Sequence, residues 1–278
     1  MKKSVLAVSI ITYRRSKLLD LCLKSVNDAM YKKAYPVYII IQDALEDDLR
    51  VLNKHKSIIT EISHIQSKGA DVEELINSNR FRAWELPLIE KEHQFVICLE
   101  DDVEVAPDIF DFTEQVLKQN IDSKNFWGIN YGSFEKPADL GSYSRLRFGL
   151  HGPASLISSK SFKRFKMQRL QKFKGAIPWD SWVEPLMKTG FVATSNVSRY
   201  RDNGFSGTHA TIQNHSKYFQ QLNNSFEYNS PKSPLEYKNI DIEHKWRGDC
   251  LIYSSDKTIK WYLKYLVVRT YQILKVVK

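Results

Sequence analysis

The stretch from Phe95 to Phe110, FVICLEDDVEVAPDIF, constrains the fold most strongly, because a continuous apolar run passes directly into three carboxylates. The run Phe95–Leu99 predicts a strand that is buried in the protein. Pro107 predicts the start of a helix that extends to about Gln119. A buried strand with a charged end, followed by a helix, is typical of one repeat of an α/β sheet.

Strands and helices alternate in the same way earlier in the chain. Val5–Ile11 is a β-branched apolar run that predicts a strand, and Lys17–Val26 has apolar residues at helical spacing. Tyr38–Ile41 predicts a second short strand, and Asp71–Ile89 predicts a helix that Pro87 must bend or end. This alternation indicates the α/β class, with a mostly parallel, doubly wound sheet flanked by helices.

The second half of the chain has a less regular pattern. Short apolar runs occur at Trp127–Asn130 and Ala154–Ile157, and Asn203–Ser233 is rich in Asn, Ser, Gly and His, which predicts a long loop region. At 278 residues, the chain is long enough for one large α/β domain with a short appendage.

Charge and cysteine content narrow the possible partners and compartment. A net charge of +9 favours anionic partners such as nucleic acid, anionic lipid or a phosphorylated small molecule. The three cysteines are widely spaced and form no disulfide or zinc pattern, which indicates a reducing compartment. The first residues predict a buried strand better than a signal peptide, and no apolar run reaches the roughly 20 residues that span a bilayer. We therefore expect a cytoplasmic protein.

Residues 257–278 predict a basic amphipathic helix. Its lysines share one narrow stripe, while aromatic and aliphatic residues cover most of the remaining surface. This pattern is typical of a helix that lies in a membrane interface, where apolar burial and attraction to anionic lipid add. A C-terminal helix docked on the domain, with its lysines in solvent, is the alternative.

Glu100, Asp101 and Asp102 are the first candidates for chemistry. Ligands of an open parallel sheet bind beyond the carboxyl ends of its strands, where these residues are expected. Three carboxylates would repel one another unless a cation joined them, and Mg²⁺ or Mn²⁺ bound to a phosphorylated ligand would be such a cation. Acidic residues can instead simply favour a helix N-terminus, an explanation that suits Glu104 or Asp108 better.

The stretch from Phe95 to Phe110, FVICLEDDVEVAPDIF, resembles the metal-binding segment of the N-acetylglucosaminyltransferase I type glycosyltransferases, which have the GT-A fold. Val5–Arg14 looks like their first strand and nucleotide-binding turn. Ile39–Asp43 looks like their second strand, which ends in an aspartate near the uracil, and Arg80–Trp84 looks like the helix before the metal strand.

Further resemblance lies in the second half of the chain. Trp179–Trp182, WDSW, is similar to the family's W-D-D-W block, with Ser181 in place of its second aspartate. Val197–Arg199 and Gly204–Ser206 are similar to its S-R pair and G-x-S loop. Together, the similar segments cover about residues 5–220.

The resemblance implies a GT-A domain over residues 1–250, with a nucleotide-binding half over about 1–120 and an acceptor half over about 121–250. It implies a metal-dependent, inverting hexosyl- or N-acetylhexosaminyltransferase that uses a nucleotide-sugar donor, with UDP as the expected nucleotide and Mn²⁺ or Mg²⁺ as the cofactor. The expected acceptor is a hydroxyl of a lipid-linked glycan in surface polysaccharide or lipopolysaccharide assembly. With the basic tail, this predicts a peripheral position on the inner face of a membrane.

The resemblance also implies roles for individual residues. Asp102 would ligate the metal, and Glu100 and Asp101 would contact the ribose or the donor sugar. Asp180 would be the catalytic base, because an attacking hydroxyl must lose its proton to a nearby group. The metal would stabilise the departing nucleoside diphosphate. A helix cap is the alternative role for Asp180.

Arginines near a strand-to-helix turn suit the recognition of phosphate or a base. Arg14 and Asp43 are therefore expected to position the nucleotide, with Arg82 a weaker candidate. Arg15 and Lys17 are expected to lie on a solvated face. The acceptor or loop candidates are His151, Trp179, Trp182, Gly204, Ser206 and His209, although the two tryptophans suit a buried core equally well.

Two other functions stay open at this point. A sugar nucleotidyltransferase usually has a glycine-rich first loop, which Thr12-Tyr13-Arg14 does not provide. A non-catalytic basic module that binds nucleotide or nucleic acid would need a basic face with interleaved aromatic residues or a recognition helix. Much of the basic excess lies in the tail instead, so we expect no nucleic-acid partner.

Overall fold

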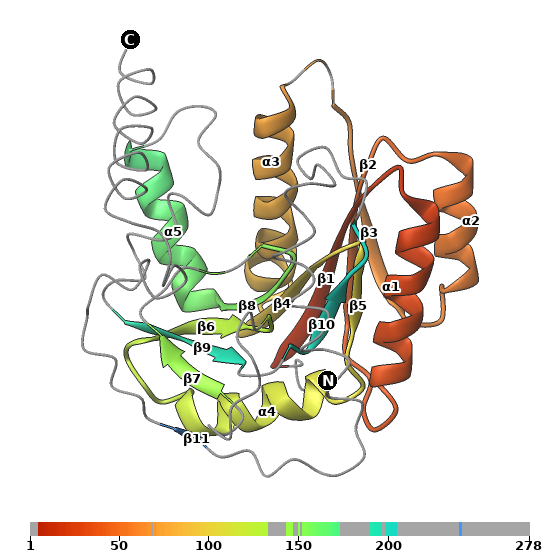
Figure 1. The fold of residues 1–278 in the computed structure, drawn as a ribbon. Helices are drawn as coiled ribbons and strands as arrows, with labels where there is room; N and C mark the ends of the chain where they lie inside the picture. The colour runs from red at the N-terminus through yellow and green to blue at the C-terminus, as the bar shows by residue number, and fades with distance from the viewer. Residues whose placement is uncertain are drawn as a thin grey trace, which may run out of the picture.

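The computed structural model describes residues 5–67, 69, 71–132, 143–146, 150, 152–172, 190–195, 198–204 and 239–240. These residues form an α/β fold around a nine-stranded sheet, in which parallel strand pairs predominate (Figure 1). The predicted fold class is therefore confirmed.

The elements of the first half are β1 (Leu6–Tyr13), α1 (Ser16–Ala29), β2 (Val37–Gln42), α2 (Glu46–Lys54), β3 (Ile59–Ile65), α3 (Val72–Glu85), the π-helical turn η1 (Leu86–Glu90), β4 (Phe95–Glu100), β5 (Val103–Val105) and α4 (Ile109–Asn120). Those of the second half are β6 (Phe126–Asn130), β7 (Tyr143–Leu146), β8 (Ala154–Ser158), α5 (Ser159–Lys172), β9 (Phe191–Ser195), β10 (Tyr200–Asp202) and β11 (Asn239–Ile240). The sheet order is β11-β7-β9-β6-β8-β4-β1-β2-β3, and β10 pairs separately with β5.

Helices cover both faces of the sheet, as a doubly wound fold requires (Figure 1). Successive side chains of β1 point to opposite faces, so Val8 packs into a core with α1, α2 and α4, whereas Ala7 packs into a core with α3 and α5. Trp84 of α3 is fully buried in the second core, where its ring contacts Phe81 and Phe162. Strands buried on both faces explain the continuous apolar runs in the sequence.

The predicted elements of the first half are present, with boundaries that differ by a few residues. α3 ends at Glu85 and the chain continues into η1 with Pro87 near its start, so of the two predicted effects, a bend or an end of the helix, the α-helix ends. α4 begins at Ile109, shortly after Pro107. The sequence patterns did not predict α2, β3 or β5.

The second half contains the strand that reverses the sheet direction beside β4. β8 runs antiparallel to β4 and to β6, and its amino end therefore lies at the carboxyl end of β4. The backbone N–H of Glu100 donates to the carbonyl of Pro153 at 2.8 Å. The two apolar runs predicted from the sequence correspond to β6 and β8.

The predicted helix over residues 257–278 and most of the predicted loop over 203–233 lie outside the described residues. The division of the domain near residue 120 also stays a prediction. Every helix in the described part of the chain falls short of the length and apolar character that crossing a membrane requires.

Candidate functional site

The carboxyl ends of the neighbouring parallel strands β1, β2 and β4 meet at one edge of the sheet. Ile11 of β1 lies beside Glu100 of β4, and Tyr13 of β1 lies beside Gln42 of β2. The residues that follow these strands are therefore brought together although they are far apart in sequence. Five predicted donor-binding residues gather along this edge, namely Arg14, Asp43, Glu100, Asp101 and Asp102.

Asp101 is fully buried and is held by groups from β1 and the turn after it. The Thr12 hydroxyl donates to its Oδ2 at 2.7 Å, and the Tyr13 N–H donates to the same oxygen at 3.3 Å. A guanidinium nitrogen of Arg15 lies 2.5 Å from its Oδ1. Burial raises the pKa of Asp101 to about 7, and repulsion from Asp102 adds to this rise, while Arg15 opposes it.

Arg15 bridges two carboxylates of the site, which corrects the prediction that it lies on a solvated face. Its Nη1 donates to Oδ2 of Asp102 at 2.7 Å, while its Nη2 pairs with Asp101. Burial disfavours the charged guanidinium, yet the nearby carboxylates of Asp101 and Asp102 raise the pKa of Arg15 above its ordinary value. The turn at Arg14 directs Arg15 toward the carboxylates, whereas Lys17 is exposed as expected.

Glu100 pairs with Arg80 of α3, a residue that sequence reasoning did not assign to the site. The side chain of Arg80 is only 2% exposed; its Nη2 contacts Glu100 Oε1, and its Nη1 lies 3.1 Å from Cys98 Sγ. Partial burial raises the pKa of Glu100 against the attraction of Arg80, and repulsion from Asp102 adds to the rise.

Arg82 is not brought to the site. Its Nε donates to Ser63 Oγ at 3.1 Å, and its Nη1 pairs with Glu90. Residues two apart in a helix do not share a face, so the helix that directs Arg80 toward β4 directs Arg82 elsewhere.

A fourth carboxylate, Asp202 of β10, completes what we call the acidic cluster, which consists of Glu100, Asp101, Asp102 and Asp202. β10 pairs with β5 so that Asp202 lies opposite Val103, the residue after Asp102. Burial raises the pKa of Asp202 to about 7, and repulsion from Asp102 adds to the rise. No sequence pattern indicates this role, because Asp202 lies beside a segment with loop composition.

Gly204, one of the predicted loop candidates, lies against the acidic cluster. Its N–H donates to Asp202 Oδ1 at 2.7 Å. A Cβ at this position would lie 3.0 Å from Asp202 Oδ1 and closer to Asp102 Oδ2 than real Cβ contacts allow. The site therefore requires glycine here, because a side chain would clash with the two carboxylates.

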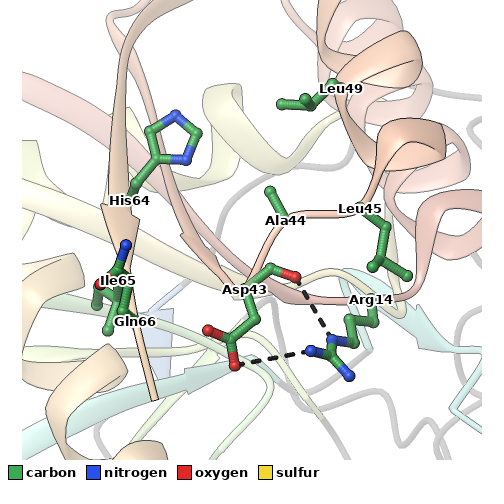
Figure 2. A pocket seen from close by; sticks show the side chains of 8 residues that line it. All are labelled: Arg14, Asp43, Ala44, Leu45, Leu49, His64, Ile65 and Gln66. Carbon is green, nitrogen blue, oxygen red and sulfur yellow. Dashed lines mark hydrogen bonds and ion pairs between the residues drawn. The ribbon is translucent and has the colours of Figure 1, made fainter. Parts of the chain in front are cut away.

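An open pocket lies beside the acidic cluster, at the ends of β2 and β3 (Figure 2). Its volume is about 620 Å³. The lining residues are Arg14, Asp43, Ala44, Leu45, Leu49, His64, Ile65 and Gln66, and we call it the Arg14–Asp43 pocket. Figure 2 shows Leu45 and Leu49, at the start of α2, on one side of the pocket and His64 of β3 on the other side. The side chains of Arg14 and Asp43 point toward each other.

The contacts within this pocket are long, and the backbone is strained. Arg14 Nε donates to the Asp43 carbonyl at 3.4 Å, and its Nη2 lies 4.0 Å from Asp43 Oδ2. Arg14 has a φ of 52° and Asp43 a φ of 44°, a left-handed conformation that costs most residues about 1–2 kcal/mol. The Ser67 N–H donates to Asp43 Oδ1 at 3.1 Å, and hydrogen bonding by Ser67 lowers the pKa of Asp43. Strained positions of this kind concentrate at functional sites.

The acidic cluster fits a divalent cation in its donor atoms and charge. Within the described ranges, no group of three or more His, Cys, Asp or Glu side chains is arranged so that it could hold a metal ion. However, Asp102 Oδ1 is buried and has no hydrogen-bond partner in the described part of the chain. In the ion pairs shown, two guanidinium groups, from Arg15 and Arg80, face three carboxylates, those of Glu100, Asp101 and Asp102. Carboxylate oxygens suit Mg²⁺ and Mn²⁺, which take further ligands from phosphate and water.

The other predicted site residues lie outside the described residues, namely Asp180, His151, Trp179, Trp182, Ser206 and His209. Their roles stay predictions. Both residues of the predicted S-R pair make contacts inside the fold. Ser198 Oγ donates to the Tyr200 carbonyl at 2.9 Å, and the buried Arg199 pairs with Asp108.

No protein-family model and no curated protein sequence matches the chain. Among solved structures, it is similar to the mannosyltransferase PcManGT from Pyrobaculum calidifontis in complex with GDP-Man and Mn²⁺, with 12% sequence identity and a TM-score of 0.45 over 84% of this chain. The chain spans 66% of the length of that mannosyltransferase. It is also similar to the galactosyltransferase LgtC in complex with donor and acceptor sugar analogues, with 14% identity and a TM-score of 0.41 over 68% of this chain and 72% of that one. Both similar proteins are glycosyltransferases, and the likeness of this chain to them is distant.

Proposed function

We propose that this protein is a divalent-metal-dependent, inverting glycosyltransferase of the GT-A type, which moves a sugar from a nucleoside diphosphate donor to a glycan hydroxyl. One observation carries the proposal: the acidic cluster and the Arg14–Asp43 pocket share the carboxyl edge of the parallel strands β1, β2 and β4. Ligands of open α/β sheets bind at this edge. The resemblance of FVICLEDDVEVAPDIF to the N-acetylglucosaminyltransferase I type enzymes supports the same function.

The Arg14–Asp43 pocket would hold the nucleoside. A volume of about 620 Å³ falls within the range of small-ligand sites, and Leu45 and Leu49 offer apolar surface to a base. The lowered pKa of Asp43 keeps its carboxylate charged at neutral pH, so it can accept a hydrogen bond from a base N–H. Uracil has such an N–H, as do the other bases, so the choice of UDP rests on the sequence resemblance of Ile39–Asp43.

The acidic cluster would hold the cation and the donor sugar. Asp102 would bind Mn²⁺ or Mg²⁺ through its unpartnered Oδ1, and the bound ion would offset the charge of the departing diphosphate. Glu100 would accept hydrogen bonds from ribose or sugar hydroxyls. Asp101 is fully buried and its Oδ1 is paired with Arg15, so it would contact the donor only after Arg15 moves. Arg15 lies close enough to the cluster to donate to a phosphate oxygen after the donor binds.

Asp180 would remove the proton from the attacking hydroxyl, a role that rests on the sequence resemblance. The acceptor class also rests on sequence. We propose a lipid-linked glycan of a surface polysaccharide or lipopolysaccharide, with residues 257–278 attracting the protein to the anionic inner face of a membrane. Release from anionic vesicles after deletion of residues 259–278 tests the membrane role, and unchanged co-sedimentation would contradict it.

A thermal-unfolding panel tests the central proposal. UDP, GDP, CDP and TDP are each added with Mn²⁺ and, in parallel, with a chelator. A ligand that binds only the folded state raises the apparent stability, so we expect a Mn²⁺-dependent rise in Tm with UDP. If no diphosphate raises the Tm, the proposal is wrong. A hit is followed by a screen of UDP-sugars for release of UDP.

A further inference from the structure

We infer that His64 holds the base of the donor nucleotide, which would stack between the His64 imidazole on one wall of the Arg14–Asp43 pocket and Leu45 and Leu49 on the other. This inference rests on the proposed function, in which the pocket takes the nucleoside. It adds a residue of β3 that none of the sequence motifs contains.

The first wall is an apolar stripe of α2 that continues beyond the core. Leu45, Leu49 and Leu52 are four and three residues apart, so they share one side of the helix and its first turn. Leu52 is 3% exposed and belongs to the core, whereas Leu49 is 47% exposed and Leu45 is 48% exposed. Both exposed leucines line the pocket. The outer part of the stripe therefore offers apolar surface that a ligand can cover.

The second wall follows from the alternation of side chains along β3. Ile62 packs against the same core as Leu52, whereas Ile65 packs against the core on the other face of the sheet. His64 lies two residues after Ile62, so its side chain is on the α2 side of the sheet. It lines the pocket, and Figure 2 shows its ring across from Leu49. The fold therefore sets an aromatic ring opposite the leucine stripe.

Hydrogen bonds hold the β3 backbone on both sides of this wall. His64 pairs with Ile41 in the parallel ladder between β3 and β2. The Asp43 N–H donates to the Ile65 carbonyl at 3.0 Å, and the Ser67 N–H donates to Asp43 Oδ1 at 3.1 Å. The end of β3 is thus tied to the turn that follows β2. A side chain on such a fixed backbone is better placed for binding than one on a loop.

These walls suit a flat heterocycle better than a phosphate or a sugar phosphate. Nucleobases stack on aromatic side chains, including histidine, whatever their sequence of polar edge groups. The leucines would cover the opposite face of the base, and Asp43 and Gln66, which also line the pocket, offer polar groups to its edge. A phosphate in the same place would instead lie against apolar surface and near the Asp43 carboxylate.

Calorimetry with two ligands tests the inference. UDP and inorganic pyrophosphate, which has no base, are each titrated into the protein with Mn²⁺. We expect His64→Ala to weaken UDP binding by about tenfold, as the loss of one stacking contact does, and to leave pyrophosphate binding unchanged. His64→Phe keeps a ring that can stack, so UDP affinity should stay within about threefold of the wild type.

Glu61→Gln is the matched control, because Glu61 lies on the same strand and pairs with Lys91 outside the pocket. It should bind UDP as the wild type does, and thermal unfolding checks that every variant is folded. Saturation-transfer NMR of the wild type is a second measurement, in which irradiation of methyl groups should reach the uracil protons more strongly than the ribose protons.

The possible results separate this inference from the proposed function. Wild-type UDP affinity in folded His64→Ala would overturn the inference and leave the proposed function intact. An equal loss of pyrophosphate binding in this variant, or a loss in His64→Phe as large as in His64→Ala, would also show that His64 does not stack on the base. Absence of UDP binding by the wild type would overturn both.

Discussion

The acidic cluster and the Arg14–Asp43 pocket lie side by side on one sheet edge, yet they are built differently. In the cluster, Asp101 is fully buried, and Arg15 contacts it and Asp102 at 2.5 and 2.7 Å. In the pocket, the side chain of Arg14 is 47% exposed and meets Asp43 at 3.4 Å or more. The cluster is organised before any ligand arrives, whereas the pocket has loose contacts that a ligand can replace. Substitutions in the cluster should therefore have the larger effects.

The largest effect is expected for Asp102→Asn. The substitution removes one charge from the proposed cation site and from the ion pair with Arg15. We expect Mn²⁺-dependent UDP binding to weaken by at least about 30-fold, equivalent to about 2 kcal/mol, as for other buried charge pairs. Isothermal titration calorimetry measures this change. Unchanged affinity would place the cation elsewhere and break the comparison between the two regions.

Arg15→Gln should mainly lower stability. It removes the guanidinium between Asp101 and Asp102, and a fully buried pair broken in this way loses about 3–5 kcal/mol. Because the Arg15 side chain is partly exposed, we expect about 1–3 kcal/mol in urea unfolding with chelator present. Added Mn²⁺ should restore part of the loss. Lys17→Gln removes an exposed charge two residues further on, in the first turn of α1, and should change the stability little. If it lowered the stability as much as Arg15→Gln, the proposed role of Arg15 would be wrong.

Between pH 5 and pH 8, the pH dependence of stability should come from the cluster and not from the pocket, because the lowered pKa of Asp43 lies below this range. Asp101 and Asp202 have pKa values of about 7, above their ordinary value of 3.8, so the folded state holds protons that the unfolded chain releases. This contribution is fully present below about pH 4 and is lost as the pH rises through 7. In chelator, the Tm should therefore fall between pH 5 and pH 8. Asp202→Asn should flatten this dependence, and an unchanged slope would show that Asp202 does not titrate there.

The smallest effect is expected in the pocket, for Arg14→Gly. Glycine adopts a positive φ without strain but loses more conformational entropy on folding, so stability should change by less than about 1 kcal/mol. UDP affinity should fall by about tenfold or less, because the Arg14 contact is exposed. Calorimetry and urea unfolding measure both quantities. A loss of UDP binding as large as that of Asp102→Asn would show that the pocket contributes as much as the cluster.

The buried strands of the first half could be predicted because they leave a continuous apolar run in the sequence. β1, β2 and β4 are covered on both faces and show this signal directly. β3 does not, because it is only partly buried and its apolar residues Ile59, Ile62 and Ile65 are spaced three apart, which does not match the alternation of a strand. α2 is short and rich in acidic residues, so few apolar positions define a helical face.

Within the site, the sequence predicted the residues whose position follows from the chain itself. Glu100, Asp101 and Asp102 come directly after a buried strand, so their place at the sheet edge follows from that strand. Arg15 and Asp202 could not be found in this way, because their contacts depend on tertiary pairing with segments far along the chain. Arg80 shows the same limit: the sequence indicated the helix but not which of its arginines faces β4.

The sheet order also governs when the site can form during synthesis. β1, β2, β3 and β4 lie close in sequence and are neighbours or near neighbours in the sheet, so this part can assemble from an incomplete chain. β9, which lies between β7 and β6, and β10, which brings Asp202 to Asp102, are made much later. A nascent chain thus presents Asp101 and Asp102 before the strand that covers them exists. The complete acidic cluster, with Asp202 beside Asp102, is therefore a property of the finished chain.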